Sequence, residues 1–333
     1  MTDSRQPQQP DRNLALELVR ATEAAAMAAG RWMGRAQKEE GDGAAVGAMR
    51  AVLNTVEMDG VVIIGEGEKD EAPMLANGER VGTGHPPEVD IAVDPVEGTT
   101  LLAEGRHGAV AVISAAPRGT LYDPGPIMYM EKWVVGPDAT GVVDLDAPVG
   151  DNLRAIAKAK GKDANDLLVM TLDRPRHDDL VRDCRAAGAR LRLISHGDVA
   201  AALLASVPES NVDVMIGIGG TPEGVLTACG LQATGGELLG RLWPRDEDER
   251  RHAEELGFDT TEILDTNRLC NSSDAFVAVT GITDGDLLAG VSYTPGGAIT
   301  ESMVMRGKSG TVRWIKAHHN LDKVMEYSAV EYG

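Results

Sequence analysis

Two acidic turns carry most of the chemistry that this sequence could perform. The first, Asp94-Pro95-Val96-Glu97-Gly98-Thr99-Thr100, places two carboxylates three residues apart and a hydroxyl soon after them. It follows the apolar run Asp90-Ile91-Ala92-Val93, so a strand that ends there leaves both carboxylates at its tip. Mg²⁺ and Mn²⁺ prefer such oxygen ligands and commonly share them with a substrate phosphate. Thr99 then lies close enough to hold a reacting water.

The second acidic turn, Gly65-Glu66-Gly67-Glu68-Lys69-Asp70-Glu71, follows the strand-like run Val61-Val62-Ile63-Ile64. Its glycines permit a tight turn at the end of that strand. A lone acidic loop is usually just solvated. Two such turns, each at the end of an apolar strand, indicate a metal site.

Together with five further segments, these turns resemble the class II fructose-1,6-bisphosphatases, the bacterial branch of the lithium-sensitive sugar-phosphatase superfamily. The first turn alone would indicate only the superfamily, whereas the ordered set is specific to class II. The matching segments are Gly41-Asp42-Gly43-Ala44-Ala45-Val46, Ile64-Gly65-Glu66-Gly67-Glu68, Asp94-Pro95-Val96-Glu97-Gly98-Thr99, Tyr129-Met130-Glu131-Lys132, Arg174-Pro175-Arg176-His177, Gly197-Asp198-Val199-Ala200 and Gly217-Ile218-Gly219-Gly220-Thr221-Pro222-Glu223-Gly224.

The resemblance implies that five carboxylates bind Mg²⁺ or Mn²⁺: Asp42, Glu66, Asp94, Glu97 and Glu223. Asp42 is expected in a glycine-flanked loop just before a helix, where a plain N-cap is the alternative role. Glu223 is expected in the first turn of a helix that opens at Thr221-Pro222. A favourable interaction with the helix dipole is the alternative there.

Thr99 is the residue expected to orient and deprotonate the attacking water. A threonine hydroxyl is a poor base without help, so a carboxylate partner is needed, and Asp42 is assigned to that task. Glu66 is placed in the same catalytic group. The alternative role for Thr99 is an N-cap at a helix start.

The substrate-binding residues implied by the resemblance are Glu97, Gly98, Thr99, Tyr129, Arg174, Arg176, His196, Asp198, Gly220 and Lys38. Arg174 and Arg176 follow a predicted strand at 167–172, and guanidinium groups bind phosphate oxygens in pairs. The carboxyl ends of strands are the usual binding edge of parallel sheets. Two surface arginines and a solvated Lys38 are the alternatives, and Asp198 is suited to accept hydrogen bonds from sugar hydroxyls.

The implied activity is metal-dependent hydrolysis of the 1-phosphate of fructose 1,6-bisphosphate, which gives fructose 6-phosphate and phosphate in gluconeogenesis. One alternative is a related sugar phosphatase that acts on sedoheptulose 1,7-bisphosphate or inositol monophosphate. Two phosphate-binding sets, the loop at Gly98-Thr99 and the arginine pair, favour a bisphosphate. The other alternative is a non-catalytic protein that binds metal or a sugar phosphate.

The chain departs from the family pattern at two places near the site. Ala36-Gln37 precedes Lys38 where relatives usually show Gly-Asp, so one acidic residue is missing. His196 stands where relatives usually carry Asp. The five carboxylates and Thr99 are retained, so activity is still expected. The run Gly217-Ile218-Gly219-Gly220-Thr221-Pro222 looks like a dinucleotide fingerprint, but Pro222 takes the place of the third glycine.

Composition narrows the class of protein. The 333 residues are 43% hydrophobic and only 3% aromatic, which predicts a globular protein with an aliphatic core. A net charge of −20 argues against nucleic acid as a partner. Three separate cysteines, Cys184, Cys229 and Cys270, favour reduced thiols and a cytoplasmic location. Neither a signal peptide nor a membrane span is expected, and the family implies a homo-oligomer, a dimer or a tetramer.

The expected fold is α/β, with an α+β first half at 13–150, an α/β second half at 151–333 and a flexible tail at 1–12. The resemblance implies a layered α-β-α-β-α sugar-phosphatase sandwich with the active site between its halves. Helices predicted from periodicity lie at 13–35, 44–56, 151–160, 177–187, 198–206 and from Thr221 onward. Strands are predicted at 61–64, 90–93, 109–115, 127–135, 167–172, 191–194 and 213–216, with further strands after 275. The regular alternation from 151 predicts a largely parallel sheet.

Overall fold

The computed structural model describes residues 12–66, 75–327 and 330. All but the last residue of the predicted tail at 1–12 therefore lies outside the described residues, as does Glu68. None of the helices in the described part combines the length and the hydropathy that a membrane crossing requires.

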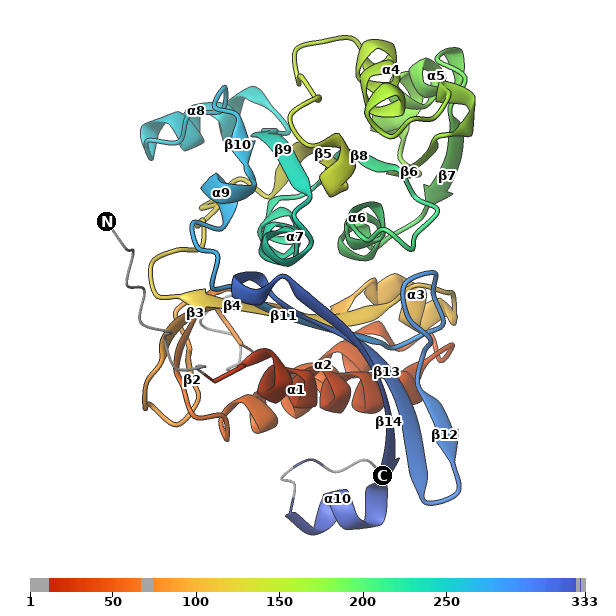
Figure 1. Ribbon diagram of the computed structural model, residues 1–333. Helices are drawn as coiled ribbons and strands as arrows, with labels where there is room; N and C mark the ends of the chain where they lie inside the picture. The colour runs from red at the N-terminus through yellow and green to blue at the C-terminus, as the bar shows by residue number, and fades with distance from the viewer. Residues whose placement is uncertain (1–11, 67–74, 328–329, 331–333) are drawn as a thin grey trace, which may run out of the picture.

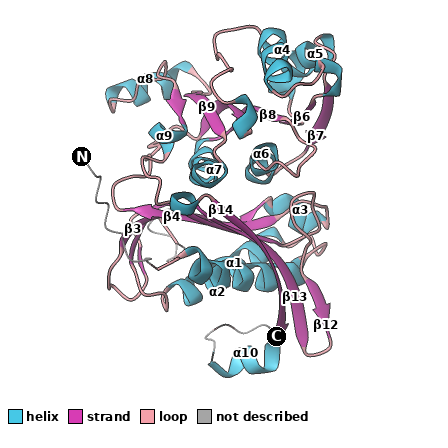
Figure 2. Cartoon of the chain, viewed as in Figure 1, coloured by secondary structure: helices cyan, strands magenta, loops and turns pink. Residues whose placement is uncertain are grey.

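Helices and sheets alternate in layers (Figures 1 and 2). One helix pair, α1 and α2, covers the outer face of the first sheet, while α6 and α7 lie between the two sheets. The pair α4 and α5 covers the second sheet from outside. The bounds are α1 (Ala15–Ala29), α2 (Lys38–Leu53), α4 (Val149–Ala159), α5 (Asp178–Ala186), α6 (Asp198–Ser206) and α7 (Thr221–Thr234). The layer order expected from the resemblance is confirmed.

The first sheet has eight strands in the order β12-β13-β11-β4-β3-β1-β2, and β14 pairs with β13 beside this path. Its pairings are antiparallel apart from the parallel pair β1 and β3. The bounds are β1 (Asp59–Ile64), β2 (Arg80–Val81), β3 (Glu88–Glu97), β4 (Val110–Pro117), β11 (Phe276–Gly281), β12 (Ser292–Thr294), β13 (Gly297–Arg306) and β14 (Thr311–Asn320).

The second sheet has six strands in the order β10-β9-β5-β8-β6-β7. Their bounds are β5 (Tyr129–Val135), β6 (Leu168–Leu172), β7 (Arg190–Ile194), β8 (Val214–Gly220), β9 (Glu237–Leu242) and β10 (Leu264–Asp265). Only β6 pairs in parallel, with β7 and β8. The prediction of a largely parallel sheet is therefore wrong, because β5 enters between β8 and β9 and runs antiparallel to both.

The two sheets do not follow the predicted division of the chain at residue 150. Strand β5 precedes that point but belongs to the second sheet, and β11 to β14 return to the first sheet from the end of the chain. The shorter helices are α3 (Thr99–Glu104), α8 (Glu247–Glu255), α9 (Thr266–Leu269) and α10 (Leu321–Tyr327). Short 3-10 turns occur at Gly30–Trp32, Pro137–Ala139, Ala164–Asp166, Pro175–His177 and Gly307–Ser309.

The apolar core is aliphatic, as the low aromatic content predicts. One cluster lies under α1 and α2, a second surrounds α6 and α7 between the sheets, and a third lies under α4 and α5. Buried alanines on α1 let that helix approach the sheet closely, and alanine is also the best helix former. Cys184, Cys229 and Cys270 are buried free thiols within this core.

Two predicted element boundaries near the site are wrong. The helix predicted at 13–35 ends at Ala29, and Gly34 takes a left-handed backbone (φ +72°) that prevents its continuation. The helix predicted at 44–56 begins earlier, at Lys38, so Asp42 lies in α2 rather than in a loop before it. Gly41 does not break this helix, because it serves close packing: a Cβ there would come within 3.0 Å of Leu102.

Strand β3 is longer than the apolar run predicts. It continues through Asp94 to Glu97, with a register shift against β4 between those two residues. The irregularity replaces the turn expected after residue 93, and the left-handed Gly98 (φ +92°) then ends the strand and opens α3. Thr99 is consequently the first residue of α3, and Gly98 is its N-cap.

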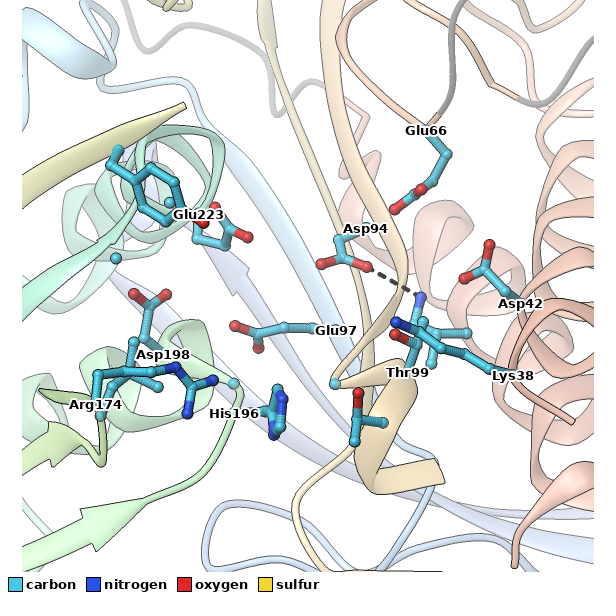
Figure 3. A pocket seen from close by; sticks show the side chains of 18 of the residues that line it. Lys38, Asp42, Glu66, Asp94, Glu97, Thr99, Arg174, His196, Asp198 and Glu223 are labelled. Atoms are coloured by element: carbon cyan, nitrogen blue, oxygen red, sulfur yellow. Dashed lines mark hydrogen bonds between the residues drawn. The ribbon is translucent and has the colours of Figure 1, made fainter. Parts of the chain in front are cut away.

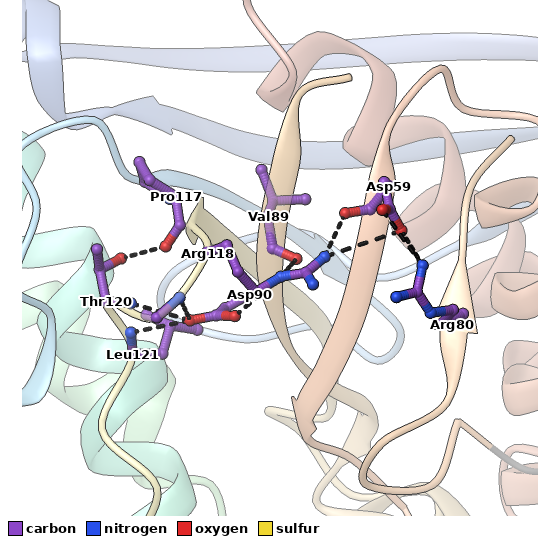
Figure 4. A network of polar contacts seen from close by, with 9 residues as sticks. Asp59, Arg80, Val89, Asp90, Pro117, Arg118, Thr120 and Leu121 are labelled. Carbon is purple, nitrogen blue, oxygen red and sulfur yellow. Dashed lines mark hydrogen bonds and ion pairs between the residues drawn. The ribbon is translucent and has the colours of Figure 1, made fainter. Parts of the chain in front are cut away.

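A polar network fixes the other end of β3 (Figure 4). The carboxylate of Asp90, which is 1% exposed, accepts hydrogen bonds from the backbone N–H groups of Gly119 (2.7 Å) and Thr120 (3.0 Å). Arg118 lies 3.4 Å from the same carboxylate and donates to the carbonyl of Val89. These bonds secure the turn after β4 and so hold the strand that carries the site.

Candidate active site

Every site residue predicted from the sequence lines one cavity of about 510 Å³, to which elements of both sheets contribute. Figure 3 shows the labelled side chains directed into a common space from opposite sides. The lining residues are Lys38, Glu39, Asp42, Glu66, Asp94, Val96, Glu97, Gly98, Thr99, Thr100, Tyr129, Leu172, Arg174, Arg176, His196, Gly197, Asp198, Gly219, Gly220 and Glu223. The structure thus brings together residues that are spread over much of the sequence.

The five carboxylates predicted to bind metal reach the cavity from α2, β3 and α7 and from the residue that follows Gly65 after β1. Asp42 projects from α2, and Glu66 follows the end of β1. Asp94 and Glu97 lie in the last four residues of β3. Glu223 comes from the first turn of α7, which lies between the sheets. The β1–β3 pairing is parallel, so the carboxyl ends of these two strands meet at the same edge.

Burial and mutual repulsion raise the pKa values of the carboxylates nearest β3. Burial, followed by the charges of Asp42 and Glu223, raises the pKa of Glu66 to about 7. Burial, followed by the charges of Glu66 and Glu97, raises the pKa of Asp94 well above its ordinary range. Such shifts mark a place where negative charge lacks a compensating cation.

The carboxylates on the second side of the cavity are raised in the same way. Burial and the charge of Asp198 raise the pKa of Glu97 to about 8, while a hydrogen bond from Val199 N–H (2.7 Å) opposes the shift. Burial and Asp198 also raise the pKa of Glu223. The Val199 bond joins the end of β3 to the start of α6, so it ties the two sides of the cavity together.

Unpartnered oxygens show which of these groups are ready to bind a ligand. Among the described residues, buried oxygens without a hydrogen-bond partner include Asp42 Oδ1, Glu97 Oε2, Asp198 Oδ1 and Glu223 Oε2. Burying such groups is costly unless a partner arrives. The donor set, made of carboxylate oxygens, is the set that Mg²⁺ and Mn²⁺ prefer.

The carboxylates share the cavity but do not form a closed cage. In the part of the chain that the structure describes, no three Asp, Glu, His or Cys side chains are arranged to hold one metal ion together. The residue types, the raised pKa values and the unpartnered oxygens nevertheless all fit a divalent cation.

Cationic groups lie beside this acidic region. Burial raises the pKa of Asp42, and the charge of Lys38 opposes that shift. Figure 3 places Lys38, Asp42 and Thr99 on one side of the cavity and Arg174 and Asp198 on the other. The cavity therefore offers positive charge at two separated places, despite the net charge of the chain.

The arginine pair is held by contacts with the second sheet. Arg176 donates to the carbonyl of Ile218 from Nη2 (2.8 Å) and Nε (3.2 Å), and its guanidinium lies 5.2 Å from the centre of the Tyr129 ring. Arg174 lines the same cavity and donates to the carbonyl of Asp173. The contacts with Ile218 and Tyr129 orient the guanidinium of Arg176, while Arg174 is held, within the described part of the chain, only by the neighbouring carbonyl of Asp173.

The two departures from the family pattern have structural consequences. Gln37 is the N-cap of α2 and makes no side-chain capping bond, and Ala36 adopts a left-handed backbone (φ +56°) that favours glycine. His196 lines the cavity, and burial followed by the charge of Arg174 lowers its pKa. The lowered pKa favours a neutral imidazole at this place in the cavity at pH 7.

Sequence reasoning assigned no role to two buried residues beside the cavity. His177 donates from Nδ1 to Leu172 O (2.7 Å) and accepts the N–H of Ile218 at Nε2 (2.8 Å), so it fixes the edge of β8. Lys132 is 1% exposed and lies next to Asp198. The signal for Lys132 was available, because it is a charge within the apolar strand predicted at 127–135.

Comparisons with known proteins agree on one family. A family model described as bacterial fructose-1,6-bisphosphatase, glpX-encoded, matches residues 12–319. The chain is 46% identical over 325 residues to fructose-1,6-bisphosphatase 1 class 2 of Escherichia coli K12. The match covers 94% of this chain and 96% of that protein. Fructose-1,6-bisphosphatase class 2 of Escherichia coli O6:H1 and that of Shigella flexneri match with the same identity and coverage.

Proposed function

The chain belongs to the bacterial, glpX-encoded fructose-1,6-bisphosphatase family, and we propose on that basis how its cavity removes the 1-phosphate of fructose 1,6-bisphosphate. The enzyme is a phosphatase that hydrolyses a phosphate monoester, and its products are fructose 6-phosphate and inorganic phosphate. Gluconeogenesis is the metabolic setting of the family.

The proposed metal ligands are Asp42, Glu66, Asp94, Glu97 and Glu223, and the proposed ions are Mg²⁺ or Mn²⁺. Support comes from the raised pKa values in this group and from its unpartnered buried oxygens. When bound, a divalent cation supplies positive charge that stabilises the phosphoryl and leaving oxygens and makes water more acidic.

Thr99 is proposed to hold the attacking water by its hydroxyl group, at the start of α3. In this proposal the hydroxyl of Thr99 takes a proton from the water and passes its own proton to the carboxylate of Asp42. Glu66 adds negative charge beside them. The backbone at Gly98-Thr99 and the ammonium of Lys38 bind the phosphate that is cleaved.

The second phosphate and the sugar are proposed to bind on the opposite side of the cavity. Arg174 and Arg176 take the 6-phosphate, since one guanidinium group can donate two hydrogen bonds to phosphate oxygens. Tyr129 packs against Arg176 and closes this end. Asp198 accepts from sugar hydroxyls. His196 and Gly220 complete the proposed substrate contacts.

One observation carries this assignment above the others. Residues from distant segments of the sequence line a single cavity, which holds five carboxylates, Thr99 and the two arginines Arg174 and Arg176. Separated phosphate-binding groups favour a sugar bisphosphate over a monophosphate. The family also leads us to propose a homo-oligomer, and the buried free thiols support a cytoplasmic location.

The test is phosphate release from fructose 1,6-bisphosphate by chelator-treated protein, with and without added Mg²⁺ or Mn²⁺. We expect release only after metal is added, and slower release from inositol 1-phosphate. Sedoheptulose 1,7-bisphosphate belongs in the same panel, because its two phosphates fit the same pair of sites. Metal-independent release, or release from the monophosphate alone, would contradict the proposal.

A further inference from the structure

A buried lysine lies directly behind the sugar-binding side of the cavity. Lys132 is 1% exposed in the middle of β5, and its Nζ lies 2.8 Å from Asp198 Oδ2. The same ammonium donates to the carbonyl of Gly220 at 2.9 Å. Asp198 and Gly220 both line the cavity, whereas Lys132 is absent from the described lining residues.

A buried lysine destabilises the folded chain unless nearby groups compensate its charge. A buried ammonium loses its hydration, and only a close anion and further acceptors compensate for that loss. Asp198, which is 4% exposed, supplies the anion, and Gly220 supplies an acceptor. The positive charge also opposes the burial-driven rise in the pKa of Glu97 and Glu223.

The glycine run before α7 leaves room for this pair. A Cβ at Gly219 would lie 1.8 Å from Asp198 Oδ2 and 3.0 Å from the Lys132 side chain. A Cβ at Gly220 would lie 1.7 Å from Glu223 Oε2. The run that looks like a dinucleotide fingerprint therefore allows β8 to pass close to three charged side chains.

We propose that Lys132 is a positioning residue for substrate binding: it fixes the Asp198 carboxylate and the Gly220 carbonyl in the orientation that receives the sugar, without touching the substrate. This inference rests on the proposed function, because Asp198 and Gly220 are proposed substrate contacts. Without the ammonium, Asp198 would face Glu97 and Glu223 as an unbalanced charge. Its carboxylate would then turn away from the sugar position.

The first test compares Lys132→Met with the wild type. We expect the KM for fructose 1,6-bisphosphate and the Kd for fructose 6-phosphate, measured by calorimetry without metal, to rise at least about tenfold. The kcat should stay within about threefold, because only uniform binding is lost. Wild-type activity in the same assay establishes that the proposed function holds independently of this outcome.

Lys160→Met is the matched control. Lys160 is a largely buried lysine at the C-terminal end of α4 that pairs with Asp138 (2.9 Å) and lies 3.7 Å from the buried Asp213. It does not line the cavity. Both variants should lose melting temperature, and Lys160→Met should lose less, because Asp138 is half-exposed and Lys162 still pairs with the buried Asp213 at 2.6 Å. Only Lys132→Met should lose affinity for the sugar phosphate.

A double-mutant cycle with Asp198→Asn tests whether Lys132 acts through its partner. We expect Lys132→Met/Asp198→Asn to bind fructose 6-phosphate within about threefold of Asp198→Asn alone, because the oriented carboxylate is already gone. Removing both charges also restores stability if Lys132→Met alone does not fold. Additive losses of affinity, or unchanged KM in Lys132→Met, would overturn the proposal. Failure of both Lys132→Met and Lys132→Met/Asp198→Asn to fold would reject a role of Lys132 that is limited to positioning.

Discussion

Thr99 is the residue on which the proposed hydrolysis depends most. It stands half-buried at the start of α3, directly after the β3 irregularity that carries Asp94 and Glu97. Its placement needs both the end of β3 and the left-handed Gly98. In the proposed mechanism, this placement lets the hydroxyl hold water without the need for a flexible loop.

Thr99→Ala should lower kcat by about 10²- to 10⁴-fold, because it removes the group that holds and deprotonates water. Thr99→Ser keeps the hydroxyl and should stay within about tenfold of the wild type. Steady-state phosphate release measures both variants, and thermal unfolding checks that the fold is intact. Near-normal turnover by Thr99→Ala would remove Thr99 from the mechanism.

The residues that line this cavity could be predicted from the sequence, but the elements in which they lie could not. Asp94 and Glu97 were expected in a turn, yet they lie in a strand whose register shifts between them. Asp42 was expected in a loop and lies in a helix. Glycines beside an acidic residue predict a turn, and close packing against Leu102 is a requirement that local sequence does not display.

At the scale of elements, the start of α2 is strained by Ala36. Its left-handed backbone (φ +56°) is held by a hydrogen bond from its N–H to Ala103 O (2.9 Å). Ala36→Gly should raise the free energy of unfolding by roughly 0.5–1 kcal/mol, since glycine adopts this backbone without strain. Urea unfolding measures the change. Ala51→Gly, inside α2, should lower the free energy of unfolding by about 1 kcal/mol. A lower free energy of unfolding in Ala36→Gly as well would contradict the claim that Ala36 strains the backbone.

Helix α1 carries a buried carboxylate that makes stability depend on pH. Burial raises the pKa of Glu23 to about 7, although Thr300, which donates to it at 3.5 Å, and then the charge of Arg20 oppose the shift. The folded chain therefore keeps a proton that the unfolded chain loses above its ordinary pKa of 4.5. Stability from this group is full below pH 4.5 and falls as pH rises toward 7.

Glu23→Gln should remove that loss. We expect the difference in free energy of unfolding between the variant and the wild type to be roughly 2 kcal/mol larger at pH 8 than at pH 5. Urea unfolding at both pH values measures this difference. Glu254→Gln, at an exposed position of α8, should show no such difference. An equal gain at both pH values would contradict a raised pKa for Glu23.

At the scale of the whole molecule, element types were predictable but sheet membership was not. The helices and strands between 149 and 220 lie within a few residues of their predicted positions, because their hydrophobic periodicity is regular. The place of β5 in the second sheet and the return of β11 to β14 to the first depend on pairings between distant segments. Periodicity within a segment carries no information about such partners.

The net charge of −20 describes the whole molecule and not the cavity. An acidic protein that binds an anionic substrate needs local cations, and the cavity offers Lys38, Arg174 and Arg176 beside its carboxylates. Burial, followed by the charges of neighbouring carboxylates, raises the pKa values of Glu66 and Asp94. Divalent cations would balance this charge and attract the phosphate.

Calorimetric titration of Mn²⁺ into metal-free wild type and Glu223→Gln tests this central claim most directly. Glu223 is the proposed ligand that α7 contributes from between the sheets, opposite those proposed on α2 and β3. We predict saturable binding to the wild type that weakens at least about tenfold in Glu223→Gln, because cation affinity follows the charge of the ligand set. Asp286→Asn, on the exposed surface, should bind like the wild type. Equal Mn²⁺ affinity in wild type and Glu223→Gln, or no binding to either, would contradict the account.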